Sequence, residues 1–213
     1  MRRAVVALAV LLPTLLPALL SAAHAADAVR PLPGFIAINA KGAFSMKVEV
    51  GKPLSVRVSG EEQFVKLLKT EVVDNELQVY LPEKQFSGAR GTPTVTIGMP
   101  SLSRLKLEGA GDTQVSNVGS DRLDISYLGA GHLAASGKVQ YLRLNAKGVG
   151  EVDTSKLHAE RVDVQFEGVG QVSVYASELL NAVAKGIGGL TYYGHPKKVN
   201  KDVAGIGHVR AGD

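Results

Sequence analysis

Apolar and polar residues alternate along the C-terminal half of the chain, around a recurring Gly-x-Gly triplet. Positions two, four and six residues before each triplet are mostly apolar, as is the position four residues after its first glycine. This period of two predicts a half-buried strand on each side of a glycine corner. Six triplets occur at intervals of 18 to 20 residues, and their glycines are Gly109, Gly111, Gly129, Gly131, Gly148, Gly150, Gly168, Gly170, Gly186, Gly188, Gly205 and Gly207.

A fixed period in this range is typical of a solenoid, so the fold class we predict is all-β, a parallel β-solenoid over residues 101–213. It would contain about six coils, with like positions stacked above one another. We expect the apolar middle residue of each triplet to point into the core. Stacking also predicts vertical pairs of opposite charge, such as Arg143 with Asp163 and Lys147 with Glu167.

Residues 35–100 lack the triplet and show shorter alternating runs. We interpret them as a β-meander that caps the first coil and is continuous with the solenoid. Asp74 and Asn75 separate two of the runs and predict a tight hairpin. Phe64, Leu67 and Leu68 share one helical face, which predicts a short helix over residues 61–69. The alternating runs are residues 43–50, 54–58, 72–73, 77–81 and 95–99.

The first 25 residues have the three parts of a secretory signal peptide. Arg2 and Arg3 precede an apolar stretch, and Ala23-His24-Ala25 supplies small residues at a cleavage site. The stretch is shorter than a membrane span needs, so we expect cleavage after Ala25 and no stable membrane span afterwards. Residues 26–34 then read as a linker, and the mature protein is expected in the periplasm or outside the cell.

Composition excludes several kinds of site. The chain has no Cys, which rules out disulfides, thiolate zinc sites and a cysteine nucleophile. Removal of Arg2 and Arg3 with the signal peptide lowers the formal net charge from +4 to +2, without the clustered positive charge that nucleic acid binding requires. Strands rather than helices follow the glycines, which argues against a phosphate loop. We therefore expect no cofactor, no metal and no nucleic acid partner.

Two groups of residues are candidates for weak binding. Asp112, His132 and Glu151 each lie three residues after the first glycine of a triplet, so stacking would make them neighbours on the outer surface. This column could form a metal or acid–base site, but we favour a solvated ladder of mutually paired side chains. The second group is a set of aromatic residues to test for ligand contact, Tyr141, Tyr192 and Tyr193.

The segment 95–112, the repeated triplets and the ending 189–199 with its Tyr-Tyr-Gly-x-Pro motif resemble the head GIN domain family. The resemblance covers residues 35–211. It implies a secreted bacterial protein with a β-solenoid fold, of the kind labelled as auto-transporter adhesins. The family has no established catalytic residues, so the resemblance assigns none here.

We therefore expect a non-enzymatic envelope or surface module that binds a protein or a glycan, with self-association left open. The alternative is a polysaccharide-active β-helix enzyme, which would need two carboxylates about 5–10 Å apart in a cleft. A third alternative is a structural spacer without a ligand.

The signal peptide prediction can be tested by replacing the small residues at the cleavage site. Mass spectrometry of the exported protein should find Ala26 at its N-terminus. The double variant Ala23→Leu and Ala25→Leu should remain uncleaved, because the site requires small side chains. A mature chain beginning elsewhere, or cleavage of the variant, would contradict the predicted site.

Overall fold

The computed structural model describes residues 25–82 and 93–213, so the predicted signal peptide lies outside them except for Ala25. All the strands join a single sheet, with one short helix beside it. The prediction of an all-β chain is therefore confirmed. The elements are β1 (Ala25–Val29), β2 (Ala37–Ala43), β3 (Ser45–Val50), β4 (Ser55–Glu61), α1 (Glu62–Leu67), β5 (Lys69–Val73), β6 (Glu76–Tyr80), β7 (Thr94–Met99), β8 (Arg104–Tyr193) and β9 (Lys198–Ala211).

The sheet is mixed rather than purely parallel. Parallel pairs join β2 to β6 and β8, β3 to β7 and β8, and β9 to β8. Antiparallel pairs join β1 to β4, β4 to β7 and β5 to β6. The predicted N-terminal meander is therefore wrong for β2 and β3. In a meander consecutive strands pair antiparallel, whereas β2 and β3 both extend the parallel pairing of β8.

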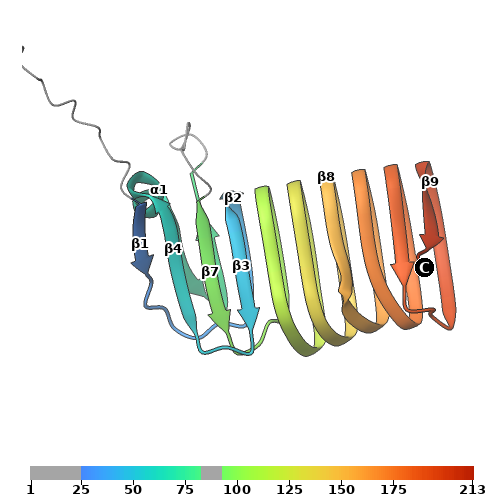
Figure 1. Cartoon of the computed structure of the whole chain (residues 1–213), viewed down its shortest axis with the longest axis horizontal. Coiled ribbons are helices and arrows are strands. Elements are labelled where there is room, and N and C mark those ends of the chain that lie inside the picture. Colours follow the sequence, from blue (N-terminus) through green and yellow to red (C-terminus); the bar gives the residue numbers. More distant parts are fainter. Residues whose placement is uncertain (1–24, 83–92) are drawn as a thin grey trace, which may run out of the picture.

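The longest element, β8, runs through five of the six triplets as one strand of 90 residues. Figure 1 shows its ribbon rising and falling in successive turns that lie side by side. β9 adds the last turn, with Leu179 opposite Lys198 and Gly186 opposite Gly205, an offset of one repeat. The core fills the space between the two walls of these turns. The inward positions predicted four residues before the triplets are buried at Leu105, Ile125, Leu144, Val164 and Ala182.

The middle residue of each triplet points outward, which corrects the sequence prediction. Val149, Val169 and Ile187 are 57%, 46% and 53% exposed. The reason is parity. Residues two, four and six before the triplet face inward, so a period of two carried to the residue after the first glycine puts that residue on the outward side of the chain.

The glycine positions of the corner have no room for a side chain. A Cβ built on Gly148 would lie 2.0 Å from the carbonyl oxygen of Gly129 in the preceding turn, and Gly148 has φ 126°. Glycine is therefore required here both by the close approach of the neighbouring backbone and by its own conformation.

One corner escaped the sequence analysis because it contains a single glycine. A Cβ on Gly109 would lie 2.1 Å from the carbonyl oxygen of Gly42, so Gly42 stacks beneath the first triplet. Phe44 stands at the position of the second glycine, and the apolar positions before the corner include the small residue Ala40. The missing triplet and this weak alternation hid strand β2.

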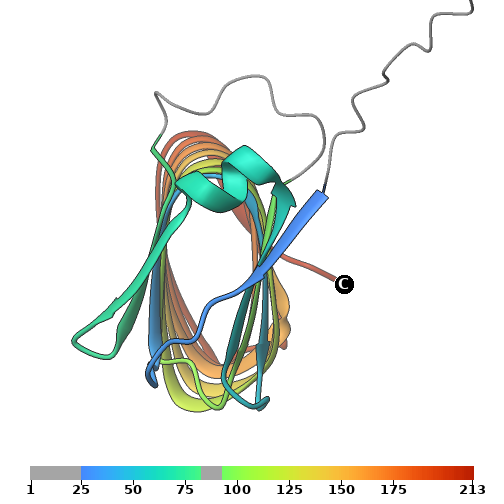
Figure 2. The same ribbon diagram turned by 90° about the vertical axis from the view of Figure 1, so that its left-hand side faces the viewer.

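At the N-terminal end the local predictions succeed. Asp74 and Asn75 join β5 to β6 with φ values of 50° and 60°, the positive angles that a type I′ hairpin turn requires. The predicted helix forms as α1, which lies across the end of the stacked turns and buries Phe64 and Val65 (Figure 2). The predicted linker 26–34 is partly wrong, because β1 pairs with β4. The inward residues of β1 are Ala26 and Ala28. Such small side chains give only a weak alternation of apolar and polar positions in the sequence.

Replacing Gly148 tests the steric constraint at the corner. Gly148→Ala should lower the free energy of unfolding by about 3 kcal/mol or more, because it combines a positive φ with a backbone clash. The matched control is Gly119→Ala, where a Cβ would meet no atom within 4 Å and φ lies outside the positive region. Denaturant unfolding of the control should differ from the parent by less than about 0.5 kcal/mol. Equal stability of the two variants would contradict the constraint.

Candidate functional site

The predicted polar column forms only in part. His132 Nδ1 lies 3.6 Å from Glu151 Oε2, both on the exposed outer surface. Asp112 lines a shallow surface hollow together with His132, Gln114 and Lys47. Within residues 25–82 and 93–213 no group of three or more His, Asp or Glu side chains could hold a metal ion. The column is thus a solvated surface ladder with one ion pair, formed only when His132 is protonated.

Tyr141 belongs to a connected set of polar side chains on the strands that precede the triplets. Its hydroxyl donates a hydrogen bond to Asp163. Asp163 also accepts from Asn181 Nδ2 at 2.6 Å, and Asn181 Oδ1 accepts from Asn200 Nδ2 at 2.8 Å. The guanidinium carbon of Arg122 lies 5.1 Å from the centre of the Tyr141 ring. We call these residues the tyrosine ladder: Arg122, Tyr141, Asp163, Asn181 and Asn200.

One of the predicted charge pairs is wrong and another is confirmed. Asp163 bonds to Tyr141 and Asn181, and the described structure holds no ion pair between Asp163 and Arg143. Lys147 Nζ lies 3.0 Å from Glu167 Oε2, as predicted. The hydrogen bond that Lys147 donates to Glu167, together with the charge of Lys147, lowers the pKa of Glu167. The stacking of turns thus determines which side chains become neighbours, while the length of each side chain decides which neighbours form a hydrogen bond or an ion pair.

Two tyrosines have raised pKa values for different reasons. The hydrogen bond to Asp163 raises the pKa of Tyr141, because ionisation of the phenol would remove the donated proton. Burial raises the pKa of Tyr127, and the charge of Asp112 adds to the effect. The Tyr127 hydroxyl is buried and has no hydrogen-bond partner among the described residues.

The other two candidate tyrosines are not part of the ladder. The Tyr192 carbonyl accepts a hydrogen bond from the Gly212 amide at 2.8 Å, and a Cβ on Gly212 would lie 2.3 Å from the Tyr193 ring. Both tyrosines are half-buried and hold the chain that follows β9. A further aromatic contact escaped the sequence analysis: the rings of His158 and Tyr175 stack 4.3 Å apart. These two residues occupy different positions in their repeats, so no column indicated the contact.

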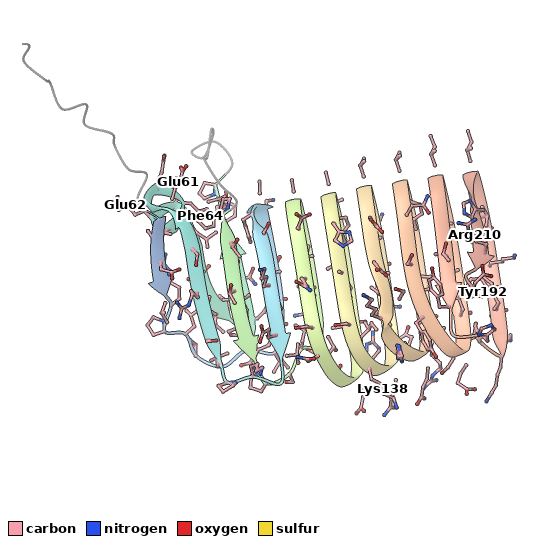
Figure 3. The ribbon with its side chains drawn as sticks, in the orientation of Figure 1. Glu61, Glu62, Phe64, Lys138, Tyr192 and Arg210 are labelled. Atoms are coloured by element: carbon pink, nitrogen blue, oxygen red, sulfur yellow. The ribbon has the colours of Figure 1, made fainter. Side chains whose placement is uncertain are left out.

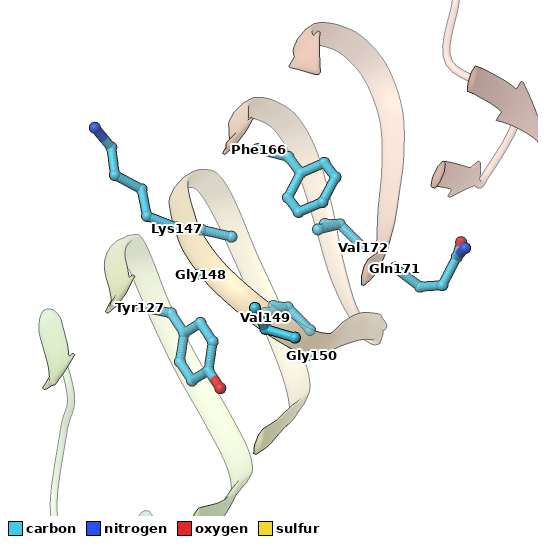
Figure 4. Close-up of a pocket in the computed structure, with 10 residues that line it drawn as sticks. Tyr127, Lys147, Gly148, Val149, Gly150, Phe166, Gln171 and Val172 are labelled. Carbon is cyan, nitrogen blue, oxygen red and sulfur yellow. The ribbon is translucent and has the colours of Figure 1, made fainter. Parts of the chain in front are cut away.

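A cavity beneath the third triplet is too small for an organic ligand. It lies between the rings of Tyr127 and Phe166, at the turn formed by Gly148 and Gly150 (Figure 4). Its volume of about 10 Å³ is close to the space that a single water molecule needs. The small side chain of Ala146, between the two rings in its column, leaves this gap. The surfaces of the stacked turns are therefore better candidates for binding than this cavity.

The sequence was compared with models of known protein families. The sequence profile described as "Putative auto-transporter adhesin, head GIN domain" matches residues 34–196. The chain belongs to this family. No curated protein matches the head GIN domain chain by sequence.

Solved structures support the fold of this head GIN domain. A protein from Bacteroides fragilis described as a "putative adhesin" is 22% identical, with a TM-score of 0.73 over 89% of this chain and 98% of the other. A protein from Parabacteroides distasonis described as a "putative lipid binding protein" is 19% identical, with a TM-score of 0.51 over 89% of this chain and 97% of the other. At these identities the likeness concerns the fold alone. Among residues 25–82 and 93–213, the structure has no helix that could serve as a membrane span.

Two tyrosine variants test the hydrogen bonding around the ladder. Tyr141→Phe should lower the melting temperature at neutral pH, because Asp163 loses a donor. Tyr127→Phe should raise the melting temperature, since the removed hydroxyl is buried without a partner among the described residues. The free energy of unfolding should increase by about 1 kcal/mol.

The pH dependence of stability provides the internal control. The pKa of Tyr141 is raised above its unfolded value, so its stabilising contribution is complete below the unfolded pKa and is lost as the pH rises through the folded pKa. The difference in melting temperature between the parent and Tyr141→Phe should therefore shrink in alkaline solution. A pH-independent difference would contradict the assigned hydrogen bond.

Proposed function

We propose that this head GIN domain is a non-enzymatic, adhesin-like module of the bacterial cell envelope or surface. The family match over residues 34–196 is the observation that carries this role. We also propose that residues 101–213 form a parallel β-solenoid, with residues 35–100 as its cap. The parallel register between β8 and β9, one repeat apart, and the stacked corner glycines support this architecture.

The tyrosine ladder is the surface that we propose for ligand binding. It presents a carboxylate, two amides, a phenol and a guanidinium across neighbouring turns. The contacts among these groups hold them in place before any ligand arrives, which reduces the entropy lost on binding. Because the turns repeat at about 4.8 Å, one polar group follows another at short intervals along the surface. An extended polymer is a better fit to such a face than a compact small molecule.

An envelope glycan is the ligand class that this chemistry favours. Amide and carboxylate side chains form hydrogen bonds with sugar hydroxyls, and a tyrosine ring offers an apolar face beside them. The charges of Arg122 and Asp124 neutralise each other through an ion pair of 2.9 Å. The surface therefore suits a ligand rich in hydroxyl groups rather than a strongly charged one.

The enzymatic alternative has less support. A glycosidase needs a carboxylic acid with a raised pKa and a second carboxylate that is available for attack or for activating water. The tyrosine ladder contains one carboxylate, Asp163, which accepts from Tyr141 and Asn181, so the ladder itself lacks the pair of carboxyl groups that a glycosidase needs. Binding without turnover is therefore the function that we propose.

A glycan array followed by retention on the best immobilised glycan tests the proposal. Asn200→Leu and Arg122→Gln alter exposed members of the ladder and should weaken retention about tenfold or more. The matched control Gln171→Leu alters an exposed amide on the strand after the corner and should bind like the parent. Release of new reducing ends from the bound glycan would favour the enzyme instead. No retention on any glycan or envelope fraction would contradict the adhesin-like role.

A further inference from the structure

The outward middle residues of the triplets form a continuous apolar strip along one edge of the molecule. Figure 3 shows one short side chain above each successive turn on this edge, whereas the opposite edge, where Lys138 is labelled, carries longer ones. The exposed fractions reach 57% at Val149, 53% at Ile187 and 77% at Ile206. We call this strip the apolar ridge: Ala110, Ala130, Val149, Val169, Ile187 and Ile206.

The columns beside the apolar ridge are mostly polar, with Leu128, Ala204 and Gly189 as the exceptions. On one side Lys147 pairs with Glu167, and on the other His132 lies against Glu151. An apolar centre with a polar rim is the usual anatomy of a protein interface. Single exposed apolar residues need no explanation, but aligned ones indicate an interaction site.

Side-chain size increases steadily along the apolar ridge. The first two positions are alanine, the next two valine and the last two isoleucine. A ridge that is low at one end and high at the other fits a surface with the opposite gradient. A second copy of the same ridge, reversed in direction, has that gradient.

We propose that two copies of this chain associate through their apolar ridges, antiparallel about a two-fold axis between the third and fourth triplets. In this arrangement Val149 faces the partner's Val169. Each alanine of one copy then faces an isoleucine of the other, and the combined size of opposed side chains stays nearly constant along the contact. The arrangement is isologous, so every contact occurs twice.

In the same antiparallel register, the charges in the two columns beside the apolar ridge are complementary to those of the second copy. Lys147 would face the partner's Glu167, and Asp112 would face the partner's His208. No column brings two like charges together. A parallel two-fold arrangement would instead place Glu108 opposite the partner's Asp112, and isoleucine against isoleucine at one end only. Charge and size therefore both favour the antiparallel pairing.

The expected contact is small. Six turns spaced at about 4.8 Å give a strip about 24 Å long. The two polar columns beside it are four residues apart along the strand, a width of about 13 Å, so roughly 300 Å² is covered on each copy. This is well below the roughly 800 Å² per partner of a stable interface. The dimer should therefore be weak for a single pair of molecules and gain strength where many copies are held close together.

Cysteine pairing tests the geometry directly, because the parent chain has no Cys. An oxidised mixture of the Ala130→Cys and Ile187→Cys variants should give a disulfide-linked dimer. Either variant alone should not, because its two cysteines would lie about three turns, or roughly 14 Å, apart, beyond the reach of a disulfide. Cross-linking of Ala130→Cys with itself, as efficient as in the mixture, would overturn the antiparallel pairing.

Sedimentation over a wide concentration range tests the size complementarity. Ala130→Ile should weaken association by overfilling the contact, and the double variant with Ile187→Ala should restore it. Ile187→Asp should weaken association about tenfold or more, whereas Val73→Asp, at an apolar site of similar exposure elsewhere, should leave it unchanged. Melting curves verify that each variant folds.

Two results would overturn the proposal. One is a monomer at every concentration together with no cross-link in the mixed cysteine experiment. The other is Ile187-dependent binding to phospholipid vesicles without self-association, which would assign the apolar ridge to a membrane surface.

Discussion

The close contact between the backbones of successive corners is the constraint on which the rest of the structure depends. The carbonyl oxygen of Gly129 occupies the space where a side chain at Gly148 would begin. Because no side chain separates the turns at this point, each corner lies directly on the one before it. The columns of side chains just before the corners take their register from these contacts, including Asp163, Asn181 and Asn200 of the tyrosine ladder and the charge pair of Lys147 with Glu167.

The same constraint determines which chemistry reaches the surface. Glycine takes the first and third positions of each triplet, and the residue between them faces solvent. An apolar residue there cannot contribute to the core, and its repetition in every turn is not explained by folding. The apolar ridge and the tyrosine ladder lie on different columns of the same turns. A contact between copies along the ridge would therefore leave the ladder open to a ligand.

The regular repeat explains why binding on this molecule is expected along a surface. Stacked strands with short corners leave little volume between turns, and the gap beside Tyr127 and Phe166 has room for about one water molecule. Affinity must then come from groups repeated along a face and held rigidly, and from several copies acting together. Both are compatible with an adhesin-like role and neither requires a catalytic centre.

The sequence alone determined the strand alternation and the six triplet corners of β8 and β9, the hairpin at Asp74 and Asn75 and the short helix, because each depends on local periodicity or on conformations open to few residues. It also indicated which columns would stack. Tertiary structure alone decided the rest. The Gly42 corner, the pairing of β1 and the bonding of Asp163 to Tyr141 depend on which turns become neighbours and on how far each side chain reaches. The outward direction of Val149 agrees with a period of two carried through the corner. The lack of space between the stacked backbones, which only glycine tolerates on either side of Val149, is a property of the tertiary structure.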